Sequence, residues 1–201
     1  QAEIDTAADR KQDSRYTLQP PKGGLVVRVH ARVLDGYKEP ETESAAVFQK
    51  ALSRDNLWIT ADEQAEIIAG RLPAALKRRI ARYHLVDNTR GEPPMWKVGE
   101  IKNMELDLED GKLVGAVHLE TEDGTRGYKA ELRGNLKASG NRVTEFQLVA
   151  LGEFFGEGRY TRNAPHGKFP FAVAFQLADG TDVADAVAPQ GARGWLDGYL
   201  K

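Results

Sequence analysis

The residues best suited to metal binding are His118 and Glu120, which lie two positions apart. Side chains at that spacing on a β-strand project from the same face, so an imidazole and a carboxylate would lie side by side. His30 is a conceivable third ligand, because zinc needs further nitrogen or oxygen ligands and His30 lies in another alternating segment. The chain has no cysteine and no His-Glu-x-x-His motif, so an exposed polar cluster is the simpler interpretation and no cofactor is predicted.

A pair of carboxylates, Glu153 and Glu157, could act as acid and base in the hydrolysis of a sugar. The neighbouring aromatic side chains would suit the apolar faces of sugar rings. On an extended strand this spacing places the two carboxylates roughly 13 Å apart, at about 3.3 Å per residue. That separation exceeds what either glycosidase mechanism needs, unless the nearby glycines fold the chain back. Core phenylalanines in a strand are the simpler interpretation.

The segment 87–96 is the strongest candidate for a ligand-binding or partner-binding edge. It combines charged side chains with two prolines and ends in an aromatic residue; its candidate residues are Asp87, Arg90, Glu92 and Trp96. Prolines restrict the unfolded chain, so this loop should be stiff, and stiff loops held by a scaffold often bind ligands. The alternative is a structural connector in which Arg90 pairs with Asp87 or Glu92.

A basic run over Lys77, Arg78, Arg79 and Arg82 could contact phosphate or an acidic surface. At helical spacing these residues lie opposite an apolar arc, so a solvated helix face is the simpler interpretation. The formal net charge of -2 at pH 7 is also too balanced for a dedicated nucleic-acid binder. We therefore expect no nucleic-acid partner.

The elements that must position these residues are mostly β-strands between residues 100 and 180. Turn signals recur at Asp110-Gly111 and Asp123-Gly124, and aspartate-glycine favours two-residue hairpins because both central positions need positive φ. At 139–141 a three-residue loop is predicted, because it keeps Leu148 on the common apolar face. The residues that these registers place on that face include Met104, Val117, Ala130 and Leu148.

Other elements precede and follow this meander. Alternation over 25–34 predicts a first strand, the apolar spacing over 44–83 predicts helices, and 191–201 predicts a short C-terminal helix. Thr60 and Glu63 have the spacing of a capping box. The predicted fold is α+β: an antiparallel β-meander of about six strands, strongly curled or barrel-like, with the helical segment packed on or beside it.

The composition is that of a folded globular chain, with 41% hydrophobic and 29% charged residues among 201. We predict a polar tether over 1–23 and a single domain over 24–201. The first residue is Gln1, and the polar start is typical of an exported protein after signal-peptide removal, although a trimmed cytoplasmic chain would look the same. No apolar run is long enough for a transmembrane helix.

No motif in the chain defines a reaction, and three functions are compatible with it. The favoured hypothesis is a non-enzymatic exported module that binds an unidentified ligand or protein through the sheet interior, its mouth or the 87–96 loop. The second is a hydrolase acting on a sugar or ester through Glu153, Glu157 or His118. The third is a scaffold or accessory domain without a small-molecule ligand. The oligomeric state is not defined by the sequence.

Overall fold

The computed structural model describes residues 18–201, so most of the predicted tether over 1–23 lies outside the described residues. The strands are β1 (Leu25–Val33), β2 (Asp55–Ile59), β3 (Ile101–Glu109), β4 (Lys112–Glu120), β5 (Gly127–Ser139), β6 (Arg142–Phe155) and β7 (Lys168–Leu177). They form one antiparallel seven-stranded sheet in the order β2-β1-β7-β6-β5-β4-β3. The predicted α+β class with a curled antiparallel sheet is confirmed, with seven strands where about six were expected.

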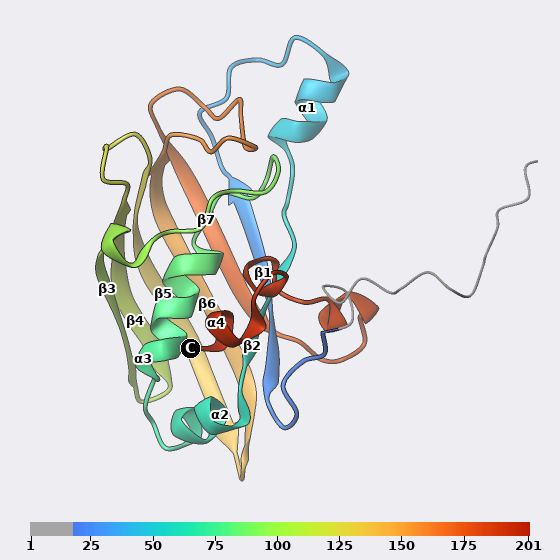
Figure 1. Cartoon of the computed structure of the whole chain (residues 1–201), viewed down its shortest axis with the longest axis vertical. Helices are drawn as coiled ribbons and strands as arrows, with labels where there is room; N and C mark the ends of the chain where they lie inside the picture. The colour runs from blue at the N-terminus through green and yellow to red at the C-terminus, as the bar shows by residue number, and fades with distance from the viewer. Residues whose placement is uncertain (1–17) are drawn as a thin grey trace, which may run out of the picture.

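Helices cover the concave face of this sheet. The α-helices are α1 (Glu43–Gln49), α2 (Ala61–Ile68), α3 (Ala74–Arg79) and α4 (Leu196–Leu200), and α3 continues into a π-helical turn, η2 (Ile80–His84). Single 3₁₀ turns occur at η3 (Val98–Glu100), η4 (Val183–Ala186) and η5 (Gln190–Ala192). In Figure 1, α2, α3 and α4 lie in front of the sheet, whereas α1 stands apart at one end. No helix in the described part of the chain is long and apolar enough to cross a bilayer.

The predicted helical segment 44–83 was wrong at its centre, where the chain forms β2. All five residues of β2 are buried, so its sequence Asp-Asn-Leu-Trp-Ile shows none of the alternation that marks a half-exposed strand. The capping box predicted for the next helix is confirmed: the Thr60 side chain accepts from the Glu63 N–H, and the Glu63 carboxylate accepts from the Thr60 N–H.

The hairpin registers explain which side chains are buried. Met104 pairs with Val117 and Val117 with Ala130, as predicted, and the two-residue turn at Asp110-Gly111 is confirmed. The turn predicted at Asp123-Gly124 was wrong: the connection spans 121–126, and only Gly124 in it has positive φ. The third hairpin differs: it has a two-residue turn and a bulge between Lys137 and Ala138. The bulge adds one residue to the strand, so beyond it the side chains alternate between the two faces as they would with a three-residue turn. Leu148 therefore lies on the apolar face as expected.

The concave side is filled by side chains. An aromatic cluster of Tyr128, Phe154, Phe169 and Phe171 packs against Trp96 from the segment before β3. The Tyr128 hydroxyl donates to the carbonyls of Ala150 and Phe171, and burial raises the pKa of this tyrosine well above its ordinary value. The interior is therefore a packed core, and the hollows of the described chain lie at the edges of the sheet and on its convex face, where His118 and Glu153 line an open one of about 590 Å³.

Candidate functional site

A cleft of about 400 Å³ lies where α1 stands away from the sheet. Four segments form it: the chain after β1, α1 with its N-cap, the loop that follows η2, and the loop between β6 and β7. The side chains that matter for its chemistry are Arg90, Arg162, Tyr37, Thr42, Ser44 and Phe48. The two arginines are the only charged residues among those that line the cleft in the described chain.

Arg90 holds the wall of the cleft together. Its guanidinium pairs with the buried Asp87 carboxylate, donates to the Tyr37 hydroxyl oxygen at 2.7 Å, and reaches the Thr161 carbonyl at 3.4 Å. Asp87 also accepts from the N–H and hydroxyl of Thr89. The Asp87–Arg90 pair expected for a structural connector is therefore present, and the same arginine also faces the cleft.

Two glycines allow the loops around Arg90 to approach closely. Gly91 has φ of 154°, and a Cβ there would lie 2.2 Å from the carbonyl oxygen of Tyr160. A Cβ on Gly158 would lie 2.3 Å from the ring of Pro94. The loop that follows η2 and the loop between β6 and β7 are therefore pressed together, which fixes Arg90 relative to its neighbours.

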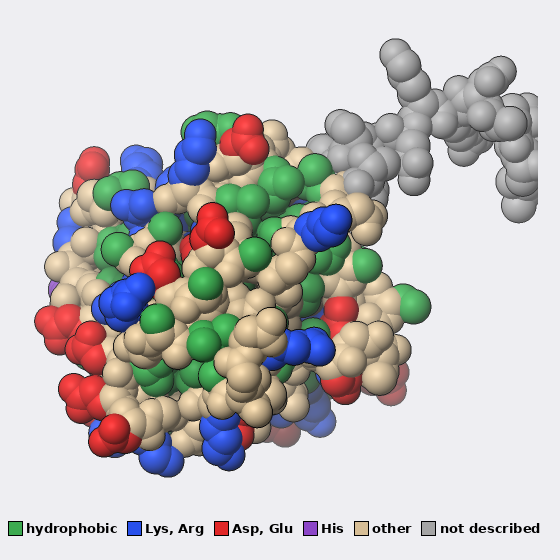
Figure 2. All heavy atoms as spheres, turned by 90° about the horizontal axis from the view of Figure 1, so that it is seen from below, with side chains coloured by type: hydrophobic (Ala, Val, Ile, Leu, Met, Phe, Trp, Pro, Cys, Tyr) green, Lys and Arg blue, Asp and Glu red, His purple; other side chains and the backbone are tan. Residues whose placement is uncertain are grey.

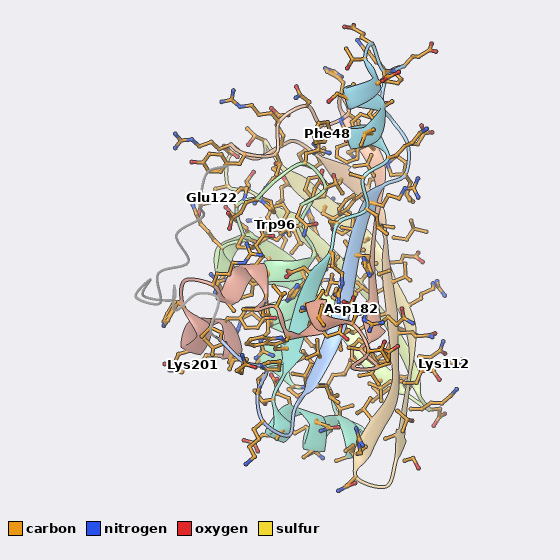
Figure 3. All side chains as sticks on the ribbon, turned by 90° about the vertical axis from the view of Figure 1, so that its right-hand side faces the viewer. Phe48, Trp96, Lys112, Glu122, Asp182 and Lys201 are labelled. Atoms are coloured by element: carbon orange, nitrogen blue, oxygen red, sulfur yellow. The ribbon has the colours of Figure 1, made fainter. Side chains whose placement is uncertain are left out.

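The opposite wall, α1, rests on the molecule through few contacts. The Thr42 side chain caps it by accepting from the Ala45 N–H, and Gln49 donates to the Lys38 carbonyl at 3.1 Å. None of its residues is buried. Phe48 is 59% exposed and Val47 is 70% exposed. Figure 3 shows Phe48 at one end of the molecule, well away from α4. The helix thus presents apolar side chains to solvent beside a cationic cleft.

The electrostatics of the cleft favour an anion. Burial raises the pKa of Tyr37 against the opposing effect of Arg90, so the hydroxyl is neutral and can donate while its oxygen accepts from Arg90. Arg162 is exposed and forms no ion pair with any described residue. The Asp87 carboxylate balances the charge of Arg90, so Arg162 supplies the net positive charge of this partly apolar site.

Of the four predicted edge residues only Arg90 lines the cleft: Asp87 is buried beside it, and Trp96 and Glu92 lie outside. Trp96 is fully buried, donates from its indole to the Leu85 carbonyl at 2.8 Å, and has the Arg126 guanidinium 3.9 Å from its ring centre. Figure 3 shows Trp96 nearer the middle of the molecule than Phe48. Glu92 is exposed and is not among the lining residues. Trp96 therefore supports the loop from inside.

Only two of the three predicted metal ligands are brought together. His118 and Glu120 do form a pair, with Nε2 2.9 Å from the carboxylate, and this contact lowers the pKa of Glu120. His30 lies on β1, with β7, β6 and β5 between it and β4, and its ring contacts the Ser53 carbonyl. Within residues 18–201 there is no group of three or more potential ligands that could hold a metal ion.

The two predicted acid and base residues have separate surroundings. Glu153 projects from β6 beside Lys168, with nitrogen and oxygen 3.8 Å apart, and both side chains are exposed. Glu157 follows Gly156, whose φ of 81° turns the chain away from the sheet, and accepts from the Ala164 N–H at 3.2 Å. Neither residue lines the cationic cleft.

Sequence reasoning missed a buried ionic network. Arg79 was assigned to the solvated basic face, but its side chain is 1% exposed and pairs with Glu63 at 2.8 and 2.9 Å. It also donates to the carbonyls of Tyr199 and Leu200 in α4. The spacing held a signal, since Arg79 follows Leu76 by three positions and so shares its buried helical face.

A carboxylate, an imidazole and a phenol also meet in the interior. His84 Nε2 lies 2.7 Å from the Tyr199 hydroxyl, and His84 Nδ1 lies 3.2 Å from the Asp55 carboxylate. This order resembles an acid–base relay. However, His84 is 2% exposed, Tyr199 1% and Asp55 8%, so a substrate cannot reach them. Burial, reinforced by the Asp55 charge, raises the pKa of Tyr199 well above its ordinary value.

Tyr199 of this cluster and Arg79 cover the outer edge of β2. Trp58 has its backbone groups directed away from β1, and its N–H donates to the Tyr199 hydroxyl at 3.3 Å. Arg79 donates to the Trp58 carbonyl at 3.1 Å. This network is therefore structural: it docks α4 and satisfies a strand edge that would otherwise be open.

Comparison of the chain with family models, with curated proteins and with solved structures found no match. Function is therefore inferred from geometry and chemistry.

Proposed function

We propose that the protein is a non-enzymatic binding module that takes a small anionic molecule with an apolar portion in the cleft beneath α1. The observation that carries this proposal is a partly apolar cleft whose lining holds Arg162, an arginine without an ion pair to any described residue, and no carboxylate. Arginine suits carboxylates and phosphates because its planar guanidinium can donate two parallel hydrogen bonds. Export remains a prediction from the polar N-terminal sequence.

The two arginines would have different parts in binding. Arg90 is 5% exposed and already donates to Asp87, Tyr37, Thr89 and Thr161, so it would shape the wall of the cleft and orient the Tyr37 hydroxyl. Arg162 is exposed and would pair with the anion once the ligand is bound. Phe48 offers an apolar surface for the remainder of the ligand. No nucleophile with an adjacent base lines the cleft, which favours binding over a reaction.

A ligand panel tests the proposal. Thermal shift should identify aliphatic or aromatic carboxylates or phosphate monoesters that stabilise the protein, and calorimetry should then measure their affinity. Arg162→Ala should weaken binding about tenfold or more, because a charge-assisted hydrogen bond contributes about 1.5–3 kcal/mol. Arg159→Ala is the matched control, since Arg159 is an exposed arginine of the same loop outside the cleft.

Two further outcomes bear on the same site. Phe48→Ser should reduce affinity for ligands with longer apolar portions and leave the thermal transition unchanged, because α1 buries no side chain. Equal losses in Arg162→Ala and Arg159→Ala, or no stabilisation by any anion in the panel, would contradict the proposal.

A further inference from the structure

The two edge strands of the sheet, β2 and β3, differ in what covers them. At one end, β2 is covered by Arg79 and Tyr199. At the other end, β3 pairs with β4 on one side and with no described strand on the other. An uncovered edge strand presents unpaired N–H and C=O groups, and such an edge can accept a strand from another chain.

The hairpin geometry identifies the backbone groups that face outward. The turn Asp110-Gly111 has positive φ at both residues, 49° and 75°, and Glu109 pairs with Lys112 across it. In such a two-residue hairpin the flanking pair exchanges both hydrogen bonds, and bonded pairs then alternate along the ladder. The N–H and C=O groups that point to the open edge are therefore those of Met104, Leu106 and Leu108.

An apolar groove runs beside this edge on the concave side. It has a volume of about 480 Å³ and lies between β3 and α3. Its walls include the apolar residues Leu72, Val98, Ile101 and Met104, and Lys77 and Arg78 of α3 also line it. Val98 is 61% exposed, although it is a large apolar side chain. A residue paired with Met104 would point its side chain to this same face, because paired residues across strands share a face.

The convex side of the same strand is acidic. Glu105, Asp107 and Glu109 alternate with the inward residues and are all exposed. Figure 2 shows acidic side chains gathered on the left, the side on which β3 lies in Figure 1. A second copy pairing through its own β3 would place these carboxylates opposite one another, which is unfavourable. The acidic row therefore favours a strand whose outward residues are basic.

We propose that the free edge of β3 docks an extended segment of another protein in which apolar residues alternate with lysine or arginine. The segment extends the sheet by hydrogen-bonding to Met104, Leu106 and Leu108. Its apolar side chains enter the groove beside α3, and its basic side chains pair with Glu105 and Asp107. This surface is separate from the cleft beneath α1 and does not depend on it.

An ion pair spans the edge in the free protein. Lys77 belongs to α3 on the concave side, yet its ammonium lies 3.5 Å from the Asp107 carboxylate. The Asp107 side chain is 69% exposed, so this contact is open to solvent and readily displaced. A basic residue of the docked strand would take the place of Lys77 beside Asp107. Charged side chains of this kind also limit unspecific pairing at sheet edges.

Synthetic peptides test the docking site. Fluorescein-labelled peptides about as long as the 9 residues of β3 would be titrated with the full chain, with fluorescence anisotropy as the readout. A peptide of alternating valine and lysine should bind saturably and at least tenfold more tightly than one of alternating valine and glutamate. A peptide of the same composition with its valines and lysines in separate blocks should bind no better than the glutamate peptide, because its valines cannot share one face.

Variants of β3 complete the test. The exposed double variant Glu105→Lys/Asp107→Lys should reverse the preference between the two alternating peptides. Met104→Pro removes an outward N–H, and should abolish binding where Met104→Ala retains most of it. Circular dichroism checks that each variant is folded. If the proline variant does not fold, the double variant alone tests the proposal. Equal affinity for all three peptides, or an unchanged preference in the double variant, would overturn the proposal.

Discussion

At the scale of single residues, the strongest constraint is the guanidinium of Arg79. It is fully enclosed, forms two hydrogen bonds with Glu63, and donates to carbonyls of β2 and of the C-terminal segment. A buried charge is tolerated only when it is paired and hydrogen-bonded, so the α2–α3 segment and α4 depend on each other through this one side chain.

Arg79→Met should lower the free energy of unfolding by about 3–5 kcal/mol, because it removes the cation beside the Glu63 carboxylate, which keeps only its bond from the Thr60 N–H, and the donor to three carbonyls. Urea unfolding measures this loss. The matched control is Arg78→Met, which removes the exposed arginine before Arg79 and its solvent-exposed hydrogen bond to the Lys201 carbonyl, and should change stability by less than about 0.5 kcal/mol. Similar losses in both variants would show that Arg79 is not buried in solution.

At the scale of the elements, three glycines allow the sheet to curl. A Cβ on Gly115, Gly134 or Gly152 would lie 1.9–2.0 Å from a carbonyl oxygen of the neighbouring strand. All three have ordinary extended backbones, so the requirement is for space and not for a left-handed conformation. Close approach of the strands at these positions brings the concave face around the aromatic cluster and the helices.

Gly134→Ala should destabilise the protein by about 1–3 kcal/mol, because the added methyl would lie 2.0 Å from the Gln147 carbonyl oxygen and force two paired strands apart. Gly99→Ala is the control: no atom lies within 4 Å of a Cβ there. Chemical denaturation of both variants tests the difference. A neutral Gly134→Ala would mean that the curl of the sheet has room to relax.

The strands with alternating patterns could be predicted from the sequence, because turn chemistry and apolar parity agree there. Asp110-Gly111 defines its register through positive φ at both residues. Between β4 and β5 the alternation of apolar residues predicts the correct pairs, although Asp123 does not adopt positive φ. In contrast, β2 has both faces buried, by the core on one side and by the η4 segment bonded to Asn56 on the other. Its pattern depends on tertiary neighbours, which no local rule contains.

The candidate cleft was only partly predictable for the same reason. Asp87 and Arg90 stood out by charge within a stiff loop, and the structure places Arg90 in the wall of the cleft. Tyr37 and Arg162 come from loops far away in the sequence, and they meet Arg90 only because β1, β6 and β7 are neighbours in the sheet. Spacing along the chain cannot reveal such a meeting of separate loops.

At the scale of the whole molecule, ionisable groups limit stability at both ends of the pH range. Arg28 lowers the pKa of Asp185, and Thr181 together with Arg28 lowers that of Asp179 to about 2. A carboxyl whose folded pKa is lowered stabilises the protein above its unfolded pKa, and this contribution is lost as the pH falls. Tyr199 behaves oppositely: its raised pKa favours folding below about pH 10 and costs stability above it.

The free energy of unfolding should therefore fall as the pH drops from about 4 toward 2, and again above about pH 10. Asp185→Asn should reduce stability at neutral pH by about 1–3 kcal/mol and flatten the acidic decline, because two arginines lose a charged acceptor. Urea titrations across pH measure both effects. Glu122→Gln, an exposed carboxylate without an ion pair to any residue from 18 to 201, should reproduce the parent profile.

The unequal ends of the sheet also decide how copies of this protein can associate. A filament of stacked molecules would need each copy to offer two unoccupied ends, one to join its predecessor and one to receive its successor. The side chains of Arg79 and Tyr199 already fill the β2 end from within. Another copy therefore cannot pair its β3 with β2 at Trp58, and two β3 edges would bring their acidic rows together, so edge-to-edge stacking of the native fold is disfavoured at both ends.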